Sequence, residues 1–428
     1  MLVAVQALAG GALIAAMRCR SRRWRVRWIP LMAAFGVLTA IAAHWYLRTS
    51  GMASEPAPWQ LWVWVALSAV AVITVVAGWP GSRWPRRNLS VFAASVCLLS
   101  AGLTVNGWLG YYPTVYVAWN QLTAGPLPDQ TDWATVSARR RSAVQPTTGA
   151  VLAVTISAEA SKFSHRKEFV YLPPAWFTSS PPPRLPAVMM IAGEFNTPAD
   201  WARVGDAVTT LDAFAAVHDG NAPVAIFVDS TGAFGNDTEC VNGPRGNAAD
   251  HLTKEVVPYL VATFGVNQDR ANWGIVGFSS GGTCAIDLTV MHPATFGTFV
   301  DIAGDISPNA GTKAQTIDRL FGGDPAAWST FDPSTVISHT TYTDVTGLFV
   351  VHSAAAVTGQ AAPPTPDSYD IAANTLCALG KSHGIRCAVL ALGGRHVWPF
   401  AAAAFAATLP WLAGELNTPG VPPLPFGN

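Results

Sequence analysis

Four apolar stretches fill the first quarter of the chain, and they limit the folds open to it more than any other feature. They cover residues 2–17, 28–47, 59–79 and 90–111. A helix needs about 20 apolar residues, within a range of about 17–25, to cross a bilayer. The first stretch is short, but arginines follow it rather than precede it, which is the wrong order for a cleaved signal peptide. The sequence therefore predicts four transmembrane helices within residues 1–112.

The loops between these stretches differ in charge, and the difference predicts the orientation of the helices. The loop RCRSRRWRVR after the first stretch holds six arginines, and GSRWPRRN after the third holds three. The loop RTSGMASEPAP after the second stretch holds one. Because basic loops stay in the cytoplasm, the fourth helix should exit on the outer side. We expect a multi-pass protein of the cytoplasmic membrane whose C-terminal domain is extracytoplasmic.

The overall composition favours a membrane protein and does not indicate a nucleic-acid partner. Charged residues make up 12% of the chain, whereas about a quarter is usual in soluble domains. The mean hydropathy is +0.29. The formal net charge is zero, so the charge balance lacks the excess of basic residues that attracts nucleic acids.

The pattern changes after a connector at residues 113–147, which mixes turn formers and charges without an apolar period. Between residues 148 and 417, short β-rich stretches alternate with helical ones, and LPAVMMIAG and APVAIFVDS are apolar throughout. Strands of this kind are buried on both faces. The sequence predicts an α/β domain with a mostly parallel sheet and helices on both faces. Residues 418–428 are rich in proline and glycine and should form an irregular tail.

A G-x-S-x-G pattern stands in the centre of this domain, in WGIVGFSSGGTC. Glycines two residues before and after a serine allow a sharp turn between a strand and a helix, and Gly277, Ser279 and Gly281 have that spacing. A predicted strand precedes the pattern and a predicted helix follows it. We therefore predict that Ser279 is a catalytic nucleophile. The alternative is a tight turn lined with small residues.

A serine nucleophile of this kind is followed along the chain by an acid and then by a histidine base. His396, in LGGRHVWPF, lies in a glycine-rich loop between a predicted strand and the last helix, and it is the preferred base. Three other histidines also follow Ser279, namely His339 in a loop, His352 within or at the edge of a strand, and His383 at a helix C-terminus.

The acid and the oxyanion hole complete the predicted site. Asp367 and Asp370 stand at the start of a helix after the strand TGLFVVHS, and we prefer Asp367, which is also suited to cap that helix. Its carboxylate would hold the tautomer of His396 and stabilise the imidazolium. The oxyanion hole should use the backbone N–H groups of Ser280 and of Glu194, in the loop after VMMIAG.

Residues 148–415 resemble the esterase branch of the α/β-hydrolases that contains the mycobacterial mycolyltransferases. The resemblance rests on IAGEFNTPADW, VGFSSGGTCAIDLTVMHPATFGTFVDIAG and GGRHVWPF, in which His-x-Trp-Pro is the most specific run. It implies that Ser279 forms an acyl-enzyme, that His396 is the base and that Glu194 supplies the second oxyanion N–H. It places the acid at Pro366 or Asp367. The elbow differs from the G-x-S-x-S of the mycolyltransferases, EFNT replaces a stretch that holds an arginine, and those enzymes are secreted.

The remaining residue patterns exclude several kinds of site. The domain holds Cys240, Cys284, Cys377 and Cys387, which allow three pairings, and we prefer Cys240–Cys284 and Cys377–Cys387. No metal-ligand spacing and no nucleotide-binding glycine motif occurs, so we expect neither a metal nor a cofactor. The sequence predicts a membrane-anchored serine esterase or acyltransferase acting on acyl-ester or lipid substrates. The rival hypothesis is a non-catalytic surface-binding protein that keeps the fold.

Overall fold

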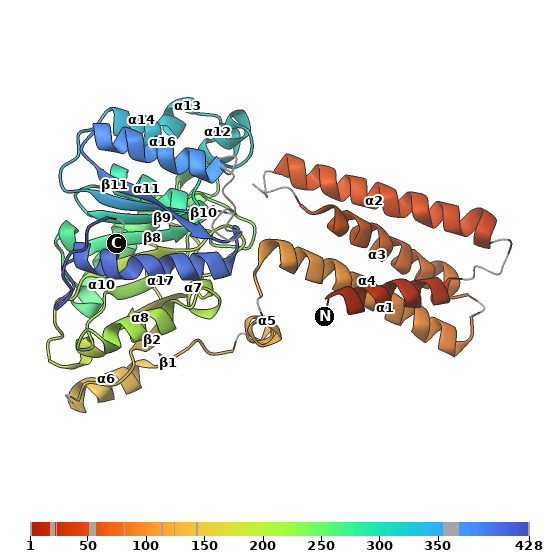
Figure 1. Cartoon of the computed structure of the whole chain (residues 1–428), viewed down its shortest axis with the longest axis horizontal. Coiled ribbons are helices and arrows are strands. Elements are labelled where there is room, and N and C mark those ends of the chain that lie inside the picture. Colours follow the sequence, from red (N-terminus) through yellow and green to blue (C-terminus); the bar gives the residue numbers. More distant parts are fainter. Residues whose placement is uncertain are drawn as a thin grey trace. The chain divides into compact units, whose positions relative to one another are not determined.

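The computed structural model describes residues 2–17, 22, 24–50, 57–80, 82–112, 114–123, 125–142, 144–353 and 368–426. Contacts divide the chain into two compact units, Met1–Tyr111 and Tyr112–Asn428. In Figure 1 the described part of the first unit consists of helices, and the second contains a sheet with helices around it. Each unit is described by itself.

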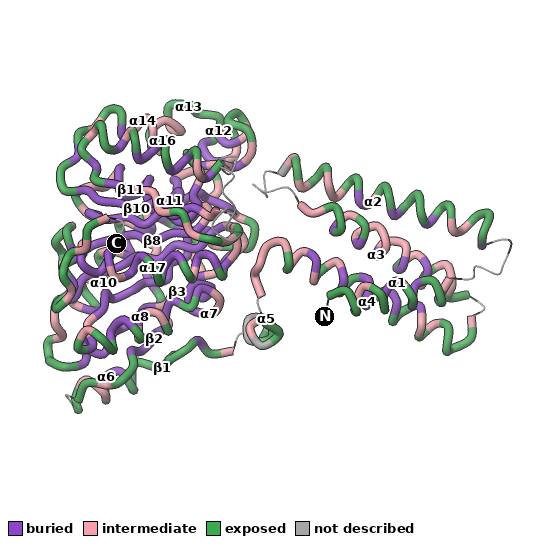
Figure 2. The backbone as a smooth tube through the Cα atoms, viewed as in Figure 1, coloured by how far each residue is buried: buried purple, intermediate pink, exposed green. Residues whose placement is uncertain are grey.

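Four apolar helices make up the N-terminal unit. They are α1 (Leu2–Ala16), α2 (Ile29–Ser50), α3 (Trp59–Gly78) and α4 (Trp84–Leu109), with a π-helical turn, η1 (Trp24–Trp28), before α2. Small residues at the contacts, such as Ala9 of α1 and Ala93 of α4, are fully buried and let the helices approach closely. By contrast, most of α2 is coloured as exposed in Figure 2, and its exposed residues include large apolar ones such as Leu31, Phe35 and Ile41. An apolar surface of this kind is typical of helices that face lipid.

The prediction of four membrane-spanning helices is wrong for the first stretch. The helix α1 has 15 residues, which at a rise of about 1.5 Å per residue is shorter than a hydrocarbon core of about 30 Å. Among the described residues, three helices are long and apolar enough to cross a membrane: Trp24–Thr49, Trp59–Gly78 and Trp84–Leu109. The helix α1 instead packs along α4, where Gln6 Nε2 donates a hydrogen bond to Thr104 Oγ1 at 3.4 Å.

A nine-stranded sheet forms the centre of the second unit, in the order β1-β2-β3-β5-β4-β8-β9-β10-β11. Its strands are β1 (Gln130–Thr131), β2 (Ala150–Val154), β3 (Glu168–Leu172), β4 (Ala187–Ile191), β5 (Val224–Val228), β8 (Trp273–Phe278), β9 (Thr298–Ile302), β10 (Thr346–Ser353) and β11 (Arg386–Gly393). Neighbours run parallel except around β3, which is antiparallel to β2 and to β5. The predicted mostly parallel sheet is thereby confirmed. The apolar stretches of the sequence are its central strands, which are buried along their whole length.

Helices cover both faces of this sheet, as two glycines of β8 demonstrate. Successive side chains of a strand point to opposite faces, so positions 274 and 277 face opposite sides. A Cβ at Gly274 would lie 3.3 Å from Leu412 of α17 (Trp398–Glu415). A Cβ at Gly277 would collide with the backbone of α11 (Ser280–Met291). The helices α17 and α11 therefore lie on opposite faces, as expected for an α/β-hydrolase.

The other helices connect the strands, and one group of them has its own small core. They are η2 (Pro174–Phe177), α7 (Asp200–Arg203), α8 (Ala207–Ala216), α9 (Ala248–Asp250), η3 (His251–Val256), α10 (Val257–Phe264), η4 (Arg270–Asn272), α12 (Lys313–Phe321), α13 (Pro325–Ser329), α14 (Pro333–Ser338) and α16 (Ser368–Ser382); a two-stranded hairpin joins β6 (Asn242–Gly243) to β7 (Gly246–Asn247). The group α12–α14 stands between β9 and β10. Its apolar side chains, with Leu320 and Phe321 at the centre, form a cluster that includes Val241.

The connector is more regular than its sequence predicts, because it contains α5 (Val115–Leu122) and α6 (Trp133–Ser142). Asp132 caps α6 by accepting a hydrogen bond from the backbone N–H of Thr135 at 2.7 Å. The ring of Trp133 stacks on Phe264, with 5.5 Å between ring centroids. The local cap and the contact with distant Phe264 stabilise a helix that lacks an apolar period of its own.

Two disulfides cross-link the second unit. Cys240 is bonded to Cys284, and Cys377 to Cys387, which are the pairs that the sequence analysis preferred. The first bond ties α11 to the loop before β6, and the second ties α16 to β11. Cys97 is a free, buried thiol in α4, whereas Cys19 lies outside the described residues.

Candidate active site

Ser279 stands at a sharp turn between β8 and α11. Its backbone has φ 61° and ψ −128°, a conformation that residues other than glycine rarely adopt. The turn depends on glycine, because a Cβ at Gly277 would lie 1.7 Å from Gly281 O, and one at Gly281 would lie 2.3 Å from Ile191 O. The G-x-S-x-G pattern thus forms the tight strand–turn–helix geometry of a nucleophile elbow.

His396 lies at hydrogen-bond distance from the elbow serine. Its Nε2 is 3.0 Å from Ser279 Oγ, which is the contact that a general base needs. The imidazole stacks on Tyr369, with ring centroids 4.7 Å apart, and it also contacts Phe278 at 4.8 Å. His352, near the end of β10, lies with its ring 6.1 Å from that of His396. Its predicted place within or at the edge of a strand did not indicate this contact.

The other ring nitrogen of His396 shows where an acid should stand. His396 Nδ1 is buried and has no hydrogen-bond partner among the described residues. Asp370, in the first turn of α16, is described and is therefore not its partner. Asp367 lies outside the described residues. The assignment of the acid to Asp367, in preference to Asp370, stays a prediction. The remaining histidines, His339 and His383, bond backbone carbonyls elsewhere.

The described surroundings keep His396 neutral. Burial, with a smaller contribution from His352, lowers the pKa of His396 to about 3. A neutral imidazole is the form that accepts a proton from a serine hydroxyl. A carboxylate facing Nδ1 would act in the opposite direction, because it stabilises the imidazolium.

We expect Asp367→Asn to move the acid limb of the pH–rate profile to lower pH. Activity is lost as the pH falls through the pKa of His396, and removing the facing carboxylate lowers that pKa towards the value set by burial and His352. The loss of the correct tautomer should also reduce kcat, by as much as about 10⁴-fold. The measurement is kcat/KM for an activated ester across the pH range. Asp370→Asn should keep the wild-type limb; the opposite pattern would identify Asp370 as the acid.

The loop after β4, which begins at Ala192, packs against Ser279 through Gly193. A Cβ at Gly193 would lie 2.8 Å from Ser279 Cβ and 3.4 Å from Ser279 Oγ. The next backbone N–H is that of Glu194, the predicted second oxyanion donor. The first predicted donor, Ser280, begins α11, and the first N–H groups of a helix have no acceptor within it. Both predicted N–H groups thus belong to segments that meet at Ser279.

Glu194 is buried within the electrostatic reach of one acidic and one basic side chain, Asp237 and Arg245, which stand more than 40 positions later in the sequence. Burial raises the pKa of Glu194 to about 8, the charge of Asp237 adds to the rise, and Arg245 opposes it. Burial and the charge of Asp237 also raise the pKa of Glu239. The Glu194 carboxyl is therefore mostly protonated at neutral pH. A neutral carboxyl does not repel the negative charge that develops in an oxyanion hole.

A second group of titratable side chains forms a hydrogen-bonded cluster whose geometry does not suit a metal. His165, Glu168 and His251 bring their possible ligand atoms within 4.8 Å of one another. The rings of His165 and His251 are stacked 4.1 Å apart with 22° between their planes, so their in-plane lone pairs do not converge on one point. The nitrogens of His251 face the carboxylates of Glu168 and Glu255 at 3.2 and 2.7 Å.

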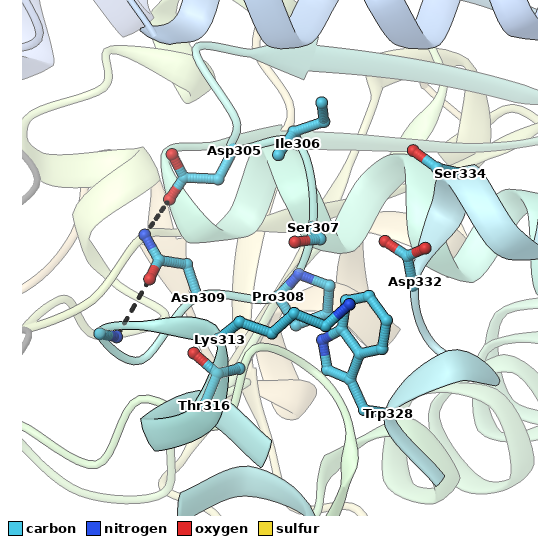
Figure 3. A pocket seen from close by; sticks show the side chains of 11 residues that line it. Asp305, Ile306, Ser307, Pro308, Asn309, Lys313, Thr316, Trp328, Asp332 and Ser334 are labelled. Carbon is cyan, nitrogen blue, oxygen red and sulfur yellow. Dashed lines mark hydrogen bonds between the residues drawn. The ribbon is translucent and has the colours of Figure 1, made fainter. Parts of the chain in front are cut away.

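A pocket of about 470 Å³ is lined by the segment between β9 and β10. Figure 3 shows the side chain of Lys313 across the ring of Trp328 and the hydrogen bond from Asn309 to Asp305. The pocket is connected to the elbow helix, because the backbone N–H of Asp305 donates to Thr283 Oγ1 at 2.9 Å. Its lining is Asp305, Ile306, Ser307, Pro308, Asn309, Gly311, Lys313, Thr316, Trp328, Asp332 and Ser334.

Known proteins resemble the chain in sequence and in structure. An uncharacterized protein of Corynebacterium glutamicum is 30% identical over 354 residues, which are 80% of each chain. An S-formylglutathione hydrolase from Agrobacterium tumefaciens is 17% identical, with a TM-score of 0.48, covering 64% of this chain and 98% of its own. MPT51 of Mycobacterium tuberculosis is 19% identical, with a TM-score of 0.43, covering 62% of this chain and 100% of its own.

The family match covers the elbow and the strands around it. Residues 163–356 match the family described as "Putative esterase". This range contains the oxyanion loop, Ser279 and β10, and it ends before the segment that bears His396. The C. glutamicum relative matches 80% of the chain, and the elbow has the geometry of a nucleophile elbow. The chain belongs to this esterase family of the α/β-hydrolases.

Proposed function

We propose that the chain is a membrane-anchored serine esterase or acyltransferase that acts on acyl esters, including lipids of the cell envelope, on the outer side of the cytoplasmic membrane. The observation that carries the proposal is the 3.0 Å distance between His396 Nε2 and Ser279 Oγ at a glycine-dependent elbow. Geometry of this kind is what acyl transfer through serine requires.

The proposed reaction has two steps. Ser279 Oγ attacks the acyl carbon while His396 Nε2 takes the hydroxyl proton, and the carbonyl oxygen becomes an oxyanion held by the N–H groups of Ser280 and Glu194. The intermediate collapses to an acyl-serine, and the alcohol leaves with the proton from His396. Water or an acceptor alcohol then attacks the acyl-serine, gives its proton to His396, and releases an acid or a new ester together with free Ser279.

The pocket between β9 and β10 favours a polar group on one side of the ester bond. Its carboxylates, amide and hydroxyls offer hydrogen bonds, and Trp328 adds one aromatic ring. A long acyl chain would leave these polar groups unpaired. We propose that the pocket receives the alcohol part of the substrate, or the acceptor alcohol in a transfer reaction.

The experiment that tests the activity uses the full chain in detergent. It measures hydrolysis of p-nitrophenyl esters of several chain lengths, with and without a sugar acceptor, and labelling by a fluorophosphonate probe. We expect hydrolysis and labelling of Ser279; an acceptor that diverts the acyl group into a new ester would identify a transferase. A chain that neither reacts with the probe nor cleaves any ester would instead support the surface-binding alternative.

The proposed location rests on three helices rather than four. Arginines precede α2 and occur between α3 and α4, so the positive-inside rule makes α2 run outward, α3 inward and α4 outward. This orientation is the same whether or not α1 crosses the membrane. The two disulfides are also typical of an oxidising compartment.

Reporter fusions at the C-terminus test this orientation. An alkaline phosphatase fusion should be active and a green fluorescent protein fusion should not fluoresce; the reverse result would overturn this orientation.

A further inference from the structure

The side-chain amide of Asn196 joins the oxyanion loop to the loop of the base. Asn196 is 5% exposed, and its Nδ2 lies 3.1 Å from both Gly193 O and Glu194 O. On its other side, Trp398 Nε1 donates to Asn196 Oδ1 at 3.1 Å. An indole N–H only donates, so the atom facing it must be Oδ1, and Nδ2 must point at the two carbonyls.

Holding these carbonyls also orients the N–H groups of the same peptide units. The C=O of Gly193 and the N–H of Glu194 belong to one planar trans peptide, in which they point in opposite directions. A bond from Asn196 to Gly193 O therefore turns the N–H of Glu194 away from Asn196. The α-carbon of Gly193 lies against Ser279, where a Cβ would come within 2.8 Å of the serine Cβ. Rotation of this peptide would remove the predicted donor from the nucleophile.

The backbone of Asn196 is held in turn by an ion pair. Arg166 Nη2 donates to Asn196 O at 2.9 Å, and the same guanidinium binds both carboxylate oxygens of Asp229 at 2.6 and 2.9 Å. Asp229 directly follows the core strand β5 and is buried. The backbone of Asn196 is thus held relative to the sheet. Its side-chain amide can therefore hold the carbonyls of Gly193 and Glu194 in place.

We propose that Asn196 is a positioning residue, which sets the direction of the Glu194 oxyanion donor and couples it through Trp398 to the loop of His396. The role rests on the proposed esterase function. Trp398 is two residues after His396, and its ring packs against Phe278, next to Ser279, with centroids 5.4 Å apart. One amide therefore connects the predicted oxyanion hole with the segment that supplies the predicted base.

The test is Asn196→Asp in the full chain in detergent. Aspartate keeps the shape and an acceptor for Trp398 Nε1, but it places an oxygen against the carbonyls of Gly193 and Glu194. We expect kcat for p-nitrophenyl esters to fall about 10²-fold with little change in KM, because an oxyanion donor is worth about 10²–10³-fold. The affinity for an alkyl trifluoromethyl ketone, whose serine adduct is an oxyanion, should fall by a similar factor.

Two further variants separate positioning from folding. Trp398→Phe keeps the packed ring and removes only the N–H, and we expect a two- to tenfold loss, roughly that of one hydrogen bond, in both kcat and ketone affinity. Asn272→Asp is the matched control, because Asn272 is also buried and donates from Nδ2 to a carbonyl, Leu416 O at 2.7 Å, but it precedes β8 at the end opposite Ser279. It should lower thermal stability and leave both readouts unchanged.

The outcomes distinguish this role from the proposed function. If wild type hydrolyses esters, and Asn196→Asp and Trp398→Phe only lose thermal stability as Asn272→Asp does, the positioning role is wrong and the esterase stands. If wild type neither hydrolyses esters nor is labelled at Ser279, the esterase proposal fails and the role of Asn196 fails with it.

Discussion

Ser279→Ala is expected to reduce ester hydrolysis by the full chain by about four to six orders of magnitude. Alanine removes the proposed nucleophilic atom, Oγ, which lies 3.0 Å from His396 Nε2. Because nucleophile and base act as a unit, Ser279→Ala combined with His396→Ala should be no slower than Ser279→Ala alone. The measurement is kcat/KM for a p-nitrophenyl ester, together with fluorophosphonate labelling, which the variant should lose completely.

The control for this substitution is Ser382→Ala. Ser382 is an exposed serine at the end of α16, where its hydroxyl donates to Leu379 O. It should keep the wild-type rate and labelling. A Ser279→Ala variant that retained both would show that another residue carries the chemistry, and the assignment of Ser279 would have to be abandoned.

Asp229→Asn is expected to lower the free energy of unfolding by about 3 kcal/mol, because removing one partner of a buried ion pair leaves the other charge without compensation. The Asp229 side chain is fully buried, whereas Arg166 is 27% exposed. Burial alone would raise the pKa of Asp229, but the bonds from Arg166 and Gly232 outweigh it and leave that pKa lowered.

The pH dependence gives a second readout of the same pair. Since the folded-state pKa of Asp229 is lowered, its contribution is present above the unfolded pKa of an aspartate and is lost as the pH falls through the folded value. Wild type and variant should therefore approach each other in acid. Urea unfolding followed by circular dichroism measures this. Lys254→Gln, which breaks the exposed pair with Asp250, should change stability by less than about 1 kcal/mol.

The central sheet could be predicted because its strands are buried on both faces. Stretches such as residues 187–191 and 224–228 are apolar without alternation, and this pattern follows directly from burial between two helical layers. The helix α6 could not be predicted in the same way, since its stability depends on the contact of Trp133 with Phe264, far along the chain. The first apolar stretch was misjudged because its composition suits a membrane but its helix is too short.

In the site, too, local sequence patterns could be predicted and contacts between distant segments could not. The elbow around Ser279 is a local pattern, and the loop of His396 follows a recognisable strand, so both could be proposed from the sequence. The contacts of Asn196 with Trp398 and of His352 with His396 join segments that are distant in the sequence, and neither residue stands in a pattern that one sequence reveals. The raised pKa of Glu194 likewise arises from burial and from Asp237, 43 positions later in the numbering.

The segment between β9 and β10 also bears on how proteins of this type diversify. It holds α12–α14 and most of a small apolar cluster that also includes Val241, and it bonds the elbow helix through Asp305 and Tyr342. Lengthening or replacing residues 303–345 would not shift the register of β8, which is fixed by β4 and β9 on its two sides. On the proposal that its pocket receives the alcohol part of the substrate, exchange of residues 303–345 between relatives should change ligand choice while the strand that precedes Ser279 keeps its register.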